Sequence, residues 1–429
     1  MNVKQKIAAV AFAATVLLCG AVPTEAAQEK VRLTWPVVPG AVQYQVVVLK
    51  NRYDAPANIL ITCNKVYTNG VEVDISPYAE QKYDLFWKVC PLNYEGKPVG
   101  GGFSAVKPLA ADGKFNTDSP LPTTEFDQMS EMALYPVYSW IPVLNAVSHQ
   151  VEVYKKDDTA AKSAVDAKDA PQERLVKQVS VSGFNYAEDV PYTEPGEYYW
   201  RVRGIDKNGM ALGNWSAKVP FTVKAPVKVA ALGDSITQGG GVVSVPAGYV
   251  MYDWETYSPV PIKNMGYSGD TLAMMLERFD RVVLPFKPQV LVIMGGVNDF
   301  RGVTTVWSAT RNLKLIKEKC QAHNIVPVFV TAPPISVRKI MLRGMMEPPP
   351  GDWRARQLKI NEWVKEQKHW VDICPALTNA RGELNENLTT DGLHPDQAAK
   401  AYIGDTVGHY VLKTFPYLFR ETVITGHAK

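Results

Sequence analysis

Apolar positions follow two different rhythms along the chain, and the change lies at the Ala225-Pro226 pair. Before it, apolar and polar residues alternate in short runs rich in Val, Tyr and Trp, separated by Gly, Pro and Asn. A period of two with turn residues between the runs predicts half-buried antiparallel strands. After it, unbroken apolar runs alternate with segments of helical period. The chain is therefore predicted to hold a β-rich half followed by an α/β half.

The α/β half is predicted to contain buried parallel strands, because its apolar runs have no polar alternation. Strands are expected at 227–232, 289–294, 326–331 and 370–374, and helices at 272–283, 306–323, 353–367 and 396–412. Alternation of this kind predicts a parallel sheet covered by helices on both faces. Ligands bind such sheets where the strands end.

The β-rich half contains a repeat. Residues 35–48 match residues 140–153, since both begin with Trp, reach Ala-Val six residues later and continue into Gln-Val-x-Val. Residues 87–104 agree with 200–216, where Trp-x-Val is followed by Gly and then by Ser. A tryptophan early in each unit and another late in it would pack between two facing sheets.

This repeat resembles the fibronectin type III domain over roughly 29–110 and 133–224. The resemblance implies two consecutive β-sandwiches. Between them, residues 111–132 are polar and contain Gly113, Pro120 and Pro122, so they are expected to form a linker or an extended connection.

Composition agrees with a large folded protein. At 429 residues the chain is too long for one ordinary domain, and its 46% hydrophobic and 21% charged residues are typical of globular proteins. The net charge of +3 is small for this length. It gives no reason to expect nucleic acid or an anionic membrane surface as a partner.

The N-terminus has the pattern of an export signal. Lys4 and Lys6 precede an apolar run at 7–18, and small residues at 24–26 offer a cleavage site. Residues 1–26 are therefore expected to be a signal peptide, which leaves a secreted, periplasmic or cell-surface protein without a transmembrane segment. Lipid attachment at Cys19 is a second hypothesis, although Leu18 departs from the small residue usual before a lipidated cysteine.

Four cysteines remain after the signal, and their spacing predicts no zinc site. Cys63 and Cys90 share one predicted unit, so they could form a disulfide outside the cell. Cys320 falls on a predicted helix and Cys374 on a predicted strand, where a small buried thiol is the commoner role.

The α/β half carries the residues of a nucleophilic site. Ser235 follows the first expected strand in a Gly-Asp-Ser turn, and a serine needs a base to act as a nucleophile. His394 is the candidate base, and Asp391 three residues before it could orient the imidazole and stabilise its charged form. Each residue alone has a structural alternative, as a turn or helix-capping residue.

Two further residues supply hydrogen-bond donors for an oxyanion. Gly269 has no side chain to block its N–H, and Asn298 has a side-chain amide. Their structural alternatives are a plain turn and a strand-end cap. The ordered set of Ser235, Gly269, Asn298 and His394 provides a nucleophile, a base and an oxyanion site together.

These motifs resemble the SGNH or GDSL hydrolase superfamily, over about residues 227–415. Its four signature residues correspond to Ser235, Gly269, Asn298 and His394, and Asp391 completes the triad by the same resemblance. The N–H of Ser235 would be a third oxyanion donor. The resemblance implies a three-layer, flavodoxin-like α/β/α fold with a five-stranded parallel sheet, ester hydrolysis through an acyl-enzyme, and no metal or organic cofactor.

Two irregular segments flank the predicted site. Residues 239–262 begin with three consecutive glycines and hold the aromatic residues Tyr249, Tyr252, Trp254 and Tyr257. The rings would stack on sugars or line an acyl pocket, or else pack the segment onto the domain. Residues 341–352 would form a rim or lid, or only a surface connection.

The sequence thus predicts a secreted serine esterase that removes acetyl or short acyl groups from a carbohydrate or cell-surface glycan. A lysophospholipase or lipase-like esterase, which would take a lysolipid, is the alternative among enzymes. An extracellular glycan- or protein-binding protein with a vestigial hydrolase domain is the alternative of another class. In either case the β-sandwiches could bind a polysaccharide or a cell surface.

Overall fold

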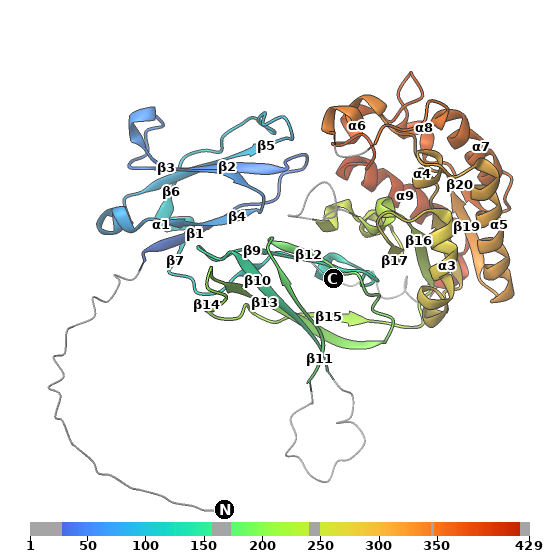
Figure 1. Ribbon diagram of the computed structural model, residues 1–429, viewed down its shortest axis with the longest axis horizontal. Helices are drawn as coiled ribbons and strands as arrows, with labels where there is room; N and C mark the ends of the chain where they lie inside the picture. Colours follow the sequence, from blue (N-terminus) through green and yellow to red (C-terminus); the bar gives the residue numbers. More distant parts are fainter. Residues whose placement is uncertain (1–27, 125, 157–172, 240–248, 345–346, 421–429) are drawn as a thin grey trace, which may run out of the picture.

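The computed structural model describes residues 28–124, 126–156, 173–239, 249–344 and 347–420. Two β-rich units are followed by an α/β domain, as Figure 1 shows from blue to red. The expected signal at 1–26, with Cys19, lies outside the described residues. Among the helices that the structure describes, none is long and apolar enough to cross a membrane.

The first unit consists of two antiparallel sheets, in the orders β4-β1-β7 and β3-β2-β5-β6. Trp35 and Trp87 are buried between them, with ring centroids 6.2 Å apart. The elements are β1 Lys30–Thr34, β2 Gln43–Leu49, β3 Ile59–Val66, β4 Gly70–Asp74, β5 Phe86–Leu92, β6 Lys107–Pro108, α1 Leu109–Asp112 and β7 Lys114–Phe115.

The second unit repeats this arrangement. Its sheets have the orders β12-β9-β8 and β11-β10-β13-β14, and β15 also pairs with β13. Trp140 and Trp200 occupy the places of the two tryptophans of the first unit, fully buried with ring centroids 6.3 Å apart. The elements are β8 Leu121–Pro122, β9 Val137–Ile141, β10 Ser148–Lys156, β11 Glu173–Val181, β12 Asn185–Ala187, β13 Gly196–Ile205, β14 Ala211–Leu212 and β15 Val219–Val223.

The repeated serines make the same contacts in both units. The Ser104 hydroxyl accepts a hydrogen bond from Val89 N–H at 3.1 Å, and the Ser216 hydroxyl accepts one from Val202 N–H at 3.0 Å. The expected linker at 111–132 is more ordered than a linker, since β7 pairs with β1 and β8 pairs with β9. Each half of the connection extends a sheet, so the two units follow one another closely.

The α/β domain is built on a five-stranded parallel sheet in the order β17-β16-β18-β19-β20. In Figure 1 the sheet lies between α9 and the group of α3, α5 and α7, which pack side by side. The strands are β16 Val229–Gly233, β17 Lys263–Gly266, β18 Val290–Met294, β19 Val326–Val330 and β20 Trp370–Val371. The helices are α2 Ser235–Gln238, α3 Leu272–Val282, α4 Val297–Phe300, α5 Val306–Ala322, α6 Val337–Arg343, α7 Trp353–Lys365, α8 Cys374–Leu377 and α9 Gln397–Thr414.

The four expected strands and the four expected helices of this half are confirmed, and each boundary lies within three residues of the expected one. The strand β17 has no apolar run to predict it. Its Lys263 side chain is buried against the second unit, whereas the Asn264 side chain is buried against α2 within the domain. At the contact with the second unit, Lys263 Nζ donates to Met132 O at 2.8 Å, and Leu134 N–H donates to Asn264 O at 2.8 Å.

The cysteines differ in part from the expectation, since all four are free. Cys63 on β3 and Cys90 on β5 lie on either side of β2, opposite Val46 and Gln45 respectively. Neighbouring residues of a strand point to opposite faces, so these thiols cannot meet in a disulfide without rearrangement. Cys320 is fully buried on α5, as predicted, but Cys374 begins the short helix α8 rather than lying on a strand.

Candidate active site

Ser235 is the first residue of α2, directly after β16. Asp234 caps the helix, since its carboxylate accepts a hydrogen bond from Ile236 N–H at 2.9 Å. Burial raises the pKa of Asp234 to about 7. The N–H of the first helical residue has no partner inside its helix, so Ser235 N–H is free to face an anion.

The three triad candidates lie in a line. Ser235 Oγ is 2.8 Å from His394 Nε2, and His394 Nδ1 is 2.7 Å from Asp391 Oδ2. The other carboxylate oxygen of Asp391 accepts the N–H groups of Leu393 and His394, both at 2.8 Å. Burial alone would raise the pKa of Asp391, but the charge and hydrogen bonds of His394 outweigh it and lower the pKa to about 2. Asp391 is therefore ionised across the working range of an esterase.

Two loops bring the other donors to the same edge of the sheet. Gly269 follows β17 with a φ of +87°, and no atom lies within 4 Å of the position that a Cβ would take. Asn298 lies on α4 after β18, and its Nδ2 donates to Asp270 O at 2.9 Å. One N–H of the amide thus fixes the glycine loop, and the second remains for an oxyanion.

Buried charges hold these loops in place. Asp299 accepts the N–H of Leu272 at 2.9 Å, and Arg278 pairs with Asp270 at 2.5 Å. Arg278 also donates to Gly233 O at 2.9 Å, which links the glycine loop to the end of β16, just before Ser235. Burial raises the pKa of Asp299 to about 6.

A second buried network supports α2 from below. Lys400 Nζ donates to Ile236 O, and Asn264 Nδ2 donates to Thr237 O at 2.6 Å. Asn264 also contacts the carboxylates of Asp253 and Glu255. Burial lowers the pKa of Lys400 to about 8 and raises that of Asp253 to about 8. The Ile236 and Thr237 carbonyls of this four-residue helix are thereby fixed by side chains far along the chain.

The aromatic rings of Tyr252 and Trp254 are buried against other parts of the protein and are not open to a substrate. Trp254 is fully buried with its Nε1 3.5 Å from Thr237 Oγ1, and Tyr252 is buried against Val42 of the first unit. For these two residues the expectation of sugar stacking is wrong, because their faces are covered. Tyr257 is partly buried and donates to Met251 O at 2.8 Å. The Tyr249 side chain and residues 240–248 lie outside what the structure describes.

Several supporting residues have no signal in the sequence. Arg278 and Lys400 are single basic residues on predicted helices, and nothing in their spacing indicates that they are buried beside the site. Asp253 and Glu255 lie within the aromatic segment, whose predicted role rests on its aromatic residues and not on these carboxylates. The helix α6, which ends inside the stretch expected to be irregular at 341–352, was also not predicted.

This arrangement can perform acyl transfer. His394 Nε2 accepts the proton of Ser235 as Oγ attacks an ester carbonyl, and Asp391 stabilises the imidazolium. The N–H groups of Ser235 and Gly269, with the Asn298 amide, would bind the oxyanion. His394 then protonates the leaving alcohol, and water repeats the steps to release the acid. Within the described ranges, no group of three or more His, Cys, Asp or Glu side chains could hold a metal ion.

Solved structures similar to this chain include several hydrolases. A GDSL-like lipase from Bacteroides thetaiotaomicron is 21% identical, with 44% of this chain and 89% of that chain covered and a TM-score of 0.35. A lipase/acylhydrolase from Enterococcus faecalis is 22% identical, with 44% and 96% covered and a TM-score of 0.35. An acetylxylan esterase from Geobacillus stearothermophilus is 18% identical, with 44% and 94% covered and a TM-score of 0.33. These scores are too low to carry an argument about substrate.

No curated protein matches the chain. Residues 231–402 match the GDSL-like Lipase/Acylhydrolase family, and the matched range contains all five candidate residues of the site. The C-terminal part of this protein is therefore a GDSL-like lipase/acylhydrolase domain, and the protein is a hydrolase that acts on esters.

Proposed function

We propose that the protein removes acetyl or other short acyl groups from an alcohol, namely a sugar hydroxyl of a carbohydrate or cell-surface glycan. The observation that carries this proposal is the aligned triad, whose serine and histidine expose little surface. Ser235 is 5% exposed and His394 is 8% exposed, which favours a small acyl group. Ser235, Asp391 and His394 act as nucleophile, orienting carboxylate and base, with Gly269 and Asn298 binding the oxyanion.

The charged surroundings support a short acyl chain over a long one. Arg301 follows Asn298 by three residues and is half-buried, and Arg343 lies beside the loop that carries Asp391. A long acyl chain gains about 0.8 kcal/mol per CH₂ only where apolar surface covers it. A charged margin offers less of that gain than an apolar groove.

The test is hydrolysis of p-nitrophenyl esters from acetyl to palmitoyl, with Ser235→Ala as the control. A sharp preference for acetyl supports the proposal, and acetate release from an O-acetylated polysaccharide would extend it to glycans. Rising turnover with chain length would contradict it and favour the lysophospholipase or lipase-like alternative. Wild-type turnover by Ser235→Ala would remove the nucleophile assignment.

We further propose that the protein is exported through the segment at 1–26, and that the two β-rich units are fibronectin type III-like sandwiches at about 29–110 and 133–224. The second unit supports this with sheets β12-β9-β8 and β11-β10-β13, the latter extended by β15. Mass spectrometry of the mature protein tests export, since it separates cleavage near Ala26 from lipid attachment at Cys19.

A further inference from the structure

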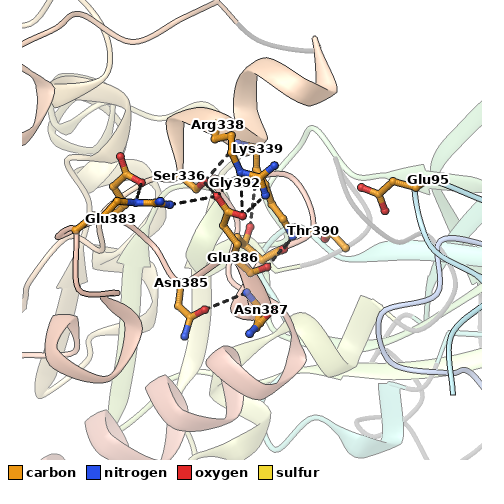
Figure 2. Close-up of polar contacts among 12 residues, drawn as sticks. Glu95, Ser336, Arg338, Lys339, Glu383, Asn385, Glu386, Asn387, Thr390 and Gly392 are labelled. Carbon is orange, nitrogen blue, oxygen red and sulfur yellow. Dashed lines mark hydrogen bonds and ion pairs between the residues drawn. The ribbon is translucent and has the colours of Figure 1, made fainter. Parts of the chain in front are cut away.

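The loop that carries Asp391 and His394 is bound by α6 along its whole length. Three donors from the start, middle and end of that helix take three carbonyl oxygens of the loop. Ser336 N–H donates to Gly392 O at 2.7 Å, Lys339 Nζ to Thr389 O at 2.6 Å, and Arg343 Nε to Thr390 O at 2.9 Å. The position of the catalytic loop therefore depends on the position of α6 (Figure 2).

The loop also lies so close to α6 at Gly392 that the two cannot move past one another. Gly392 has a φ of +90°, and a Cβ on it would stand 2.5 Å from Ser336 O and 2.7 Å from Ile340 N. Backbone atoms at such distances cannot move aside as flexible side chains can. A shift of α6 would be transmitted to the two triad residues on either side of Gly392.

Arg343, the last residue of α6, joins this assembly to the first β unit. Its Nη2 is 2.7 Å from Glu95 Oε1, and its guanidinium lies 4.6 Å from the ring centre of Tyr94. Tyr94 and Glu95 lie in the turn that follows β5. The Arg343 side chain is only 9% exposed, although its acidic partner belongs to a different unit. Figure 2 shows Glu95 on the ribbon of that unit, facing the loop that holds Thr390.

The same turn is anchored on the opposite side of the site. Tyr94 packs against the cluster of Val42 and Tyr252, and Tyr252 belongs to the segment that lies beside α2. The turn after β5 thus touches both the segment supporting Ser235 and the helix supporting His394. It is placed to fix the distance between the nucleophile and its base.

We propose that Glu95 and Arg343 are positioning residues of the ester hydrolysis, through which the first β unit fixes the loop of Asp391 and His394. The triad needs this, since misplacement of a reacting group by about 1 Å costs about 100-fold in rate. This role goes beyond the substrate proposed above, because it holds for any ester that Ser235 attacks. The first unit is then part of the catalytic apparatus and not only a surface-binding module.

The test compares Glu95→Gln, Arg343→Met, Arg343→Lys and the double variant Glu95→Gln/Arg343→Met in the full chain. The matched control is Glu29→Gln, which removes the pairing of Glu29 with Lys82 within the first unit, away from α6. Three quantities are measured: kcat and KM for p-nitrophenyl acetate, the rate at which a fluorophosphonate labels Ser235, and Tm. Labelling reports the serine–histidine pair independently of the ester chosen, so failure of the acetyl proposal would not be mistaken for failure of this one.

We expect kcat and the labelling rate to fall about 3-fold in Glu95→Gln, the scale of one exposed ion pair. Arg343→Met should lower both about 10-fold, because a charged donor to Thr390 O is lost as well. Arg343→Lys should lie between them. The double variant should match Arg343→Met, since Glu95 acts through Arg343. KM, Tm and the Glu29→Gln control should stay near wild type.

Two results would overturn the proposal. One is unchanged kcat and labelling in Glu95→Gln, an exposed substitution that does not threaten folding. The other is a double variant whose loss equals the product of the two single losses, because that result would make Glu95 independent of Arg343.

Discussion

Replacing Asn298 by Ala tests the oxyanion site most directly. In the proposed site the amide has two roles, because one N–H is bound to Asp270 O at 2.9 Å and the other would bind the substrate oxygen. Asn298→Ala removes both. The two losses differ in kind, since the first concerns the folded protein and the second only the transition state.

The expected magnitudes follow from those two roles. Loss of one oxyanion donor costs about 2.7–4 kcal/mol of transition-state stabilisation, which lowers kcat by about 100- to 1,000-fold. Loss of the bond to Asp270 O costs about 1 kcal/mol of folding free energy. Asp270 is also held by Arg278, so the glycine loop should keep its place. KM should change little, because the ground-state carbonyl makes a weaker bond than the oxyanion.

The assay is steady-state hydrolysis of p-nitrophenyl acetate, with urea unfolding on the same preparations. Ser235→Ala gives the floor of activity, and Asn298→Asp tests geometry without a donor. The Asp variant should be at least as impaired as Ala, since its charge opposes the oxyanion. A loss below 10-fold in Asn298→Ala, or a loss confined to KM, would refute the assignment of Asn298 to the oxyanion site.

Three other substitutions test the site and its support. Asp391→Asn should lower kcat about 10⁴-fold, because an amide donor facing Nδ1 favours the wrong tautomer of His394; kinetics with retained Tm check this. Gly392→Ala should cost about 1–3 kcal/mol of stability and much of the activity, since its Cβ meets the backbone of α6; unfolding by urea and kcat together check it. His149 is 3% exposed and burial lowers its pKa to about 4 from 6.5, so the unfolded chain alone binds its proton between those values. The contribution of His149 to the free energy of unfolding should therefore fall by about 3 kcal/mol as the pH drops through that window. Urea titrations at pH 7 and pH 4.5 measure it as the change in the difference between wild type and His149→Phe, because the other titrating groups are common to both.

Most of the α/β fold could be predicted, because its signals are local. Unbroken apolar runs mark β16, β18 and β19, and Thr271, Thr305 and Asp396 cap α3, α5 and α9 as their positions before helical segments suggest. The strand β17 was not predicted because its sequence, Lys-Asn-Met-Gly, contains no apolar run. Lys263 is buried against the second unit, where Met132 O accepts a hydrogen bond from its Nζ. This burial lowers the pKa of Lys263 to about 8.

The candidate residues that the structure brings together could be named from the sequence and their supports could not, for a related reason. Ser235, Gly269, Asn298 and His394 lie in short motifs whose residue types the chemistry requires. The supports act across long distances in the chain, as between Lys400 and Ile236 or Arg343 and Glu95. In the sequence, Lys400 and Arg343 cannot be distinguished from basic residues on an exposed helix surface. Only the folded arrangement distinguishes them.

The β-rich half and the α/β domain are better regarded as one folded body than as a carrier and a catalyst. The hydrophobic core is continuous from Trp140 and Trp200 of the second unit to the strands β16 and β18. Without the second unit, Lys263 would lose the carbonyl that accepts its hydrogen bond. The outer edge of β17 would also lose the hydrogen bond from Leu134 N–H. An unpaired buried charge and an open sheet edge are both costly, so the site loop after β17 would lose its support. The first unit acts on the other side of the site through Arg343. Residues on both sides of the catalytic serine are thus held by parts of the chain that contain no catalytic motif.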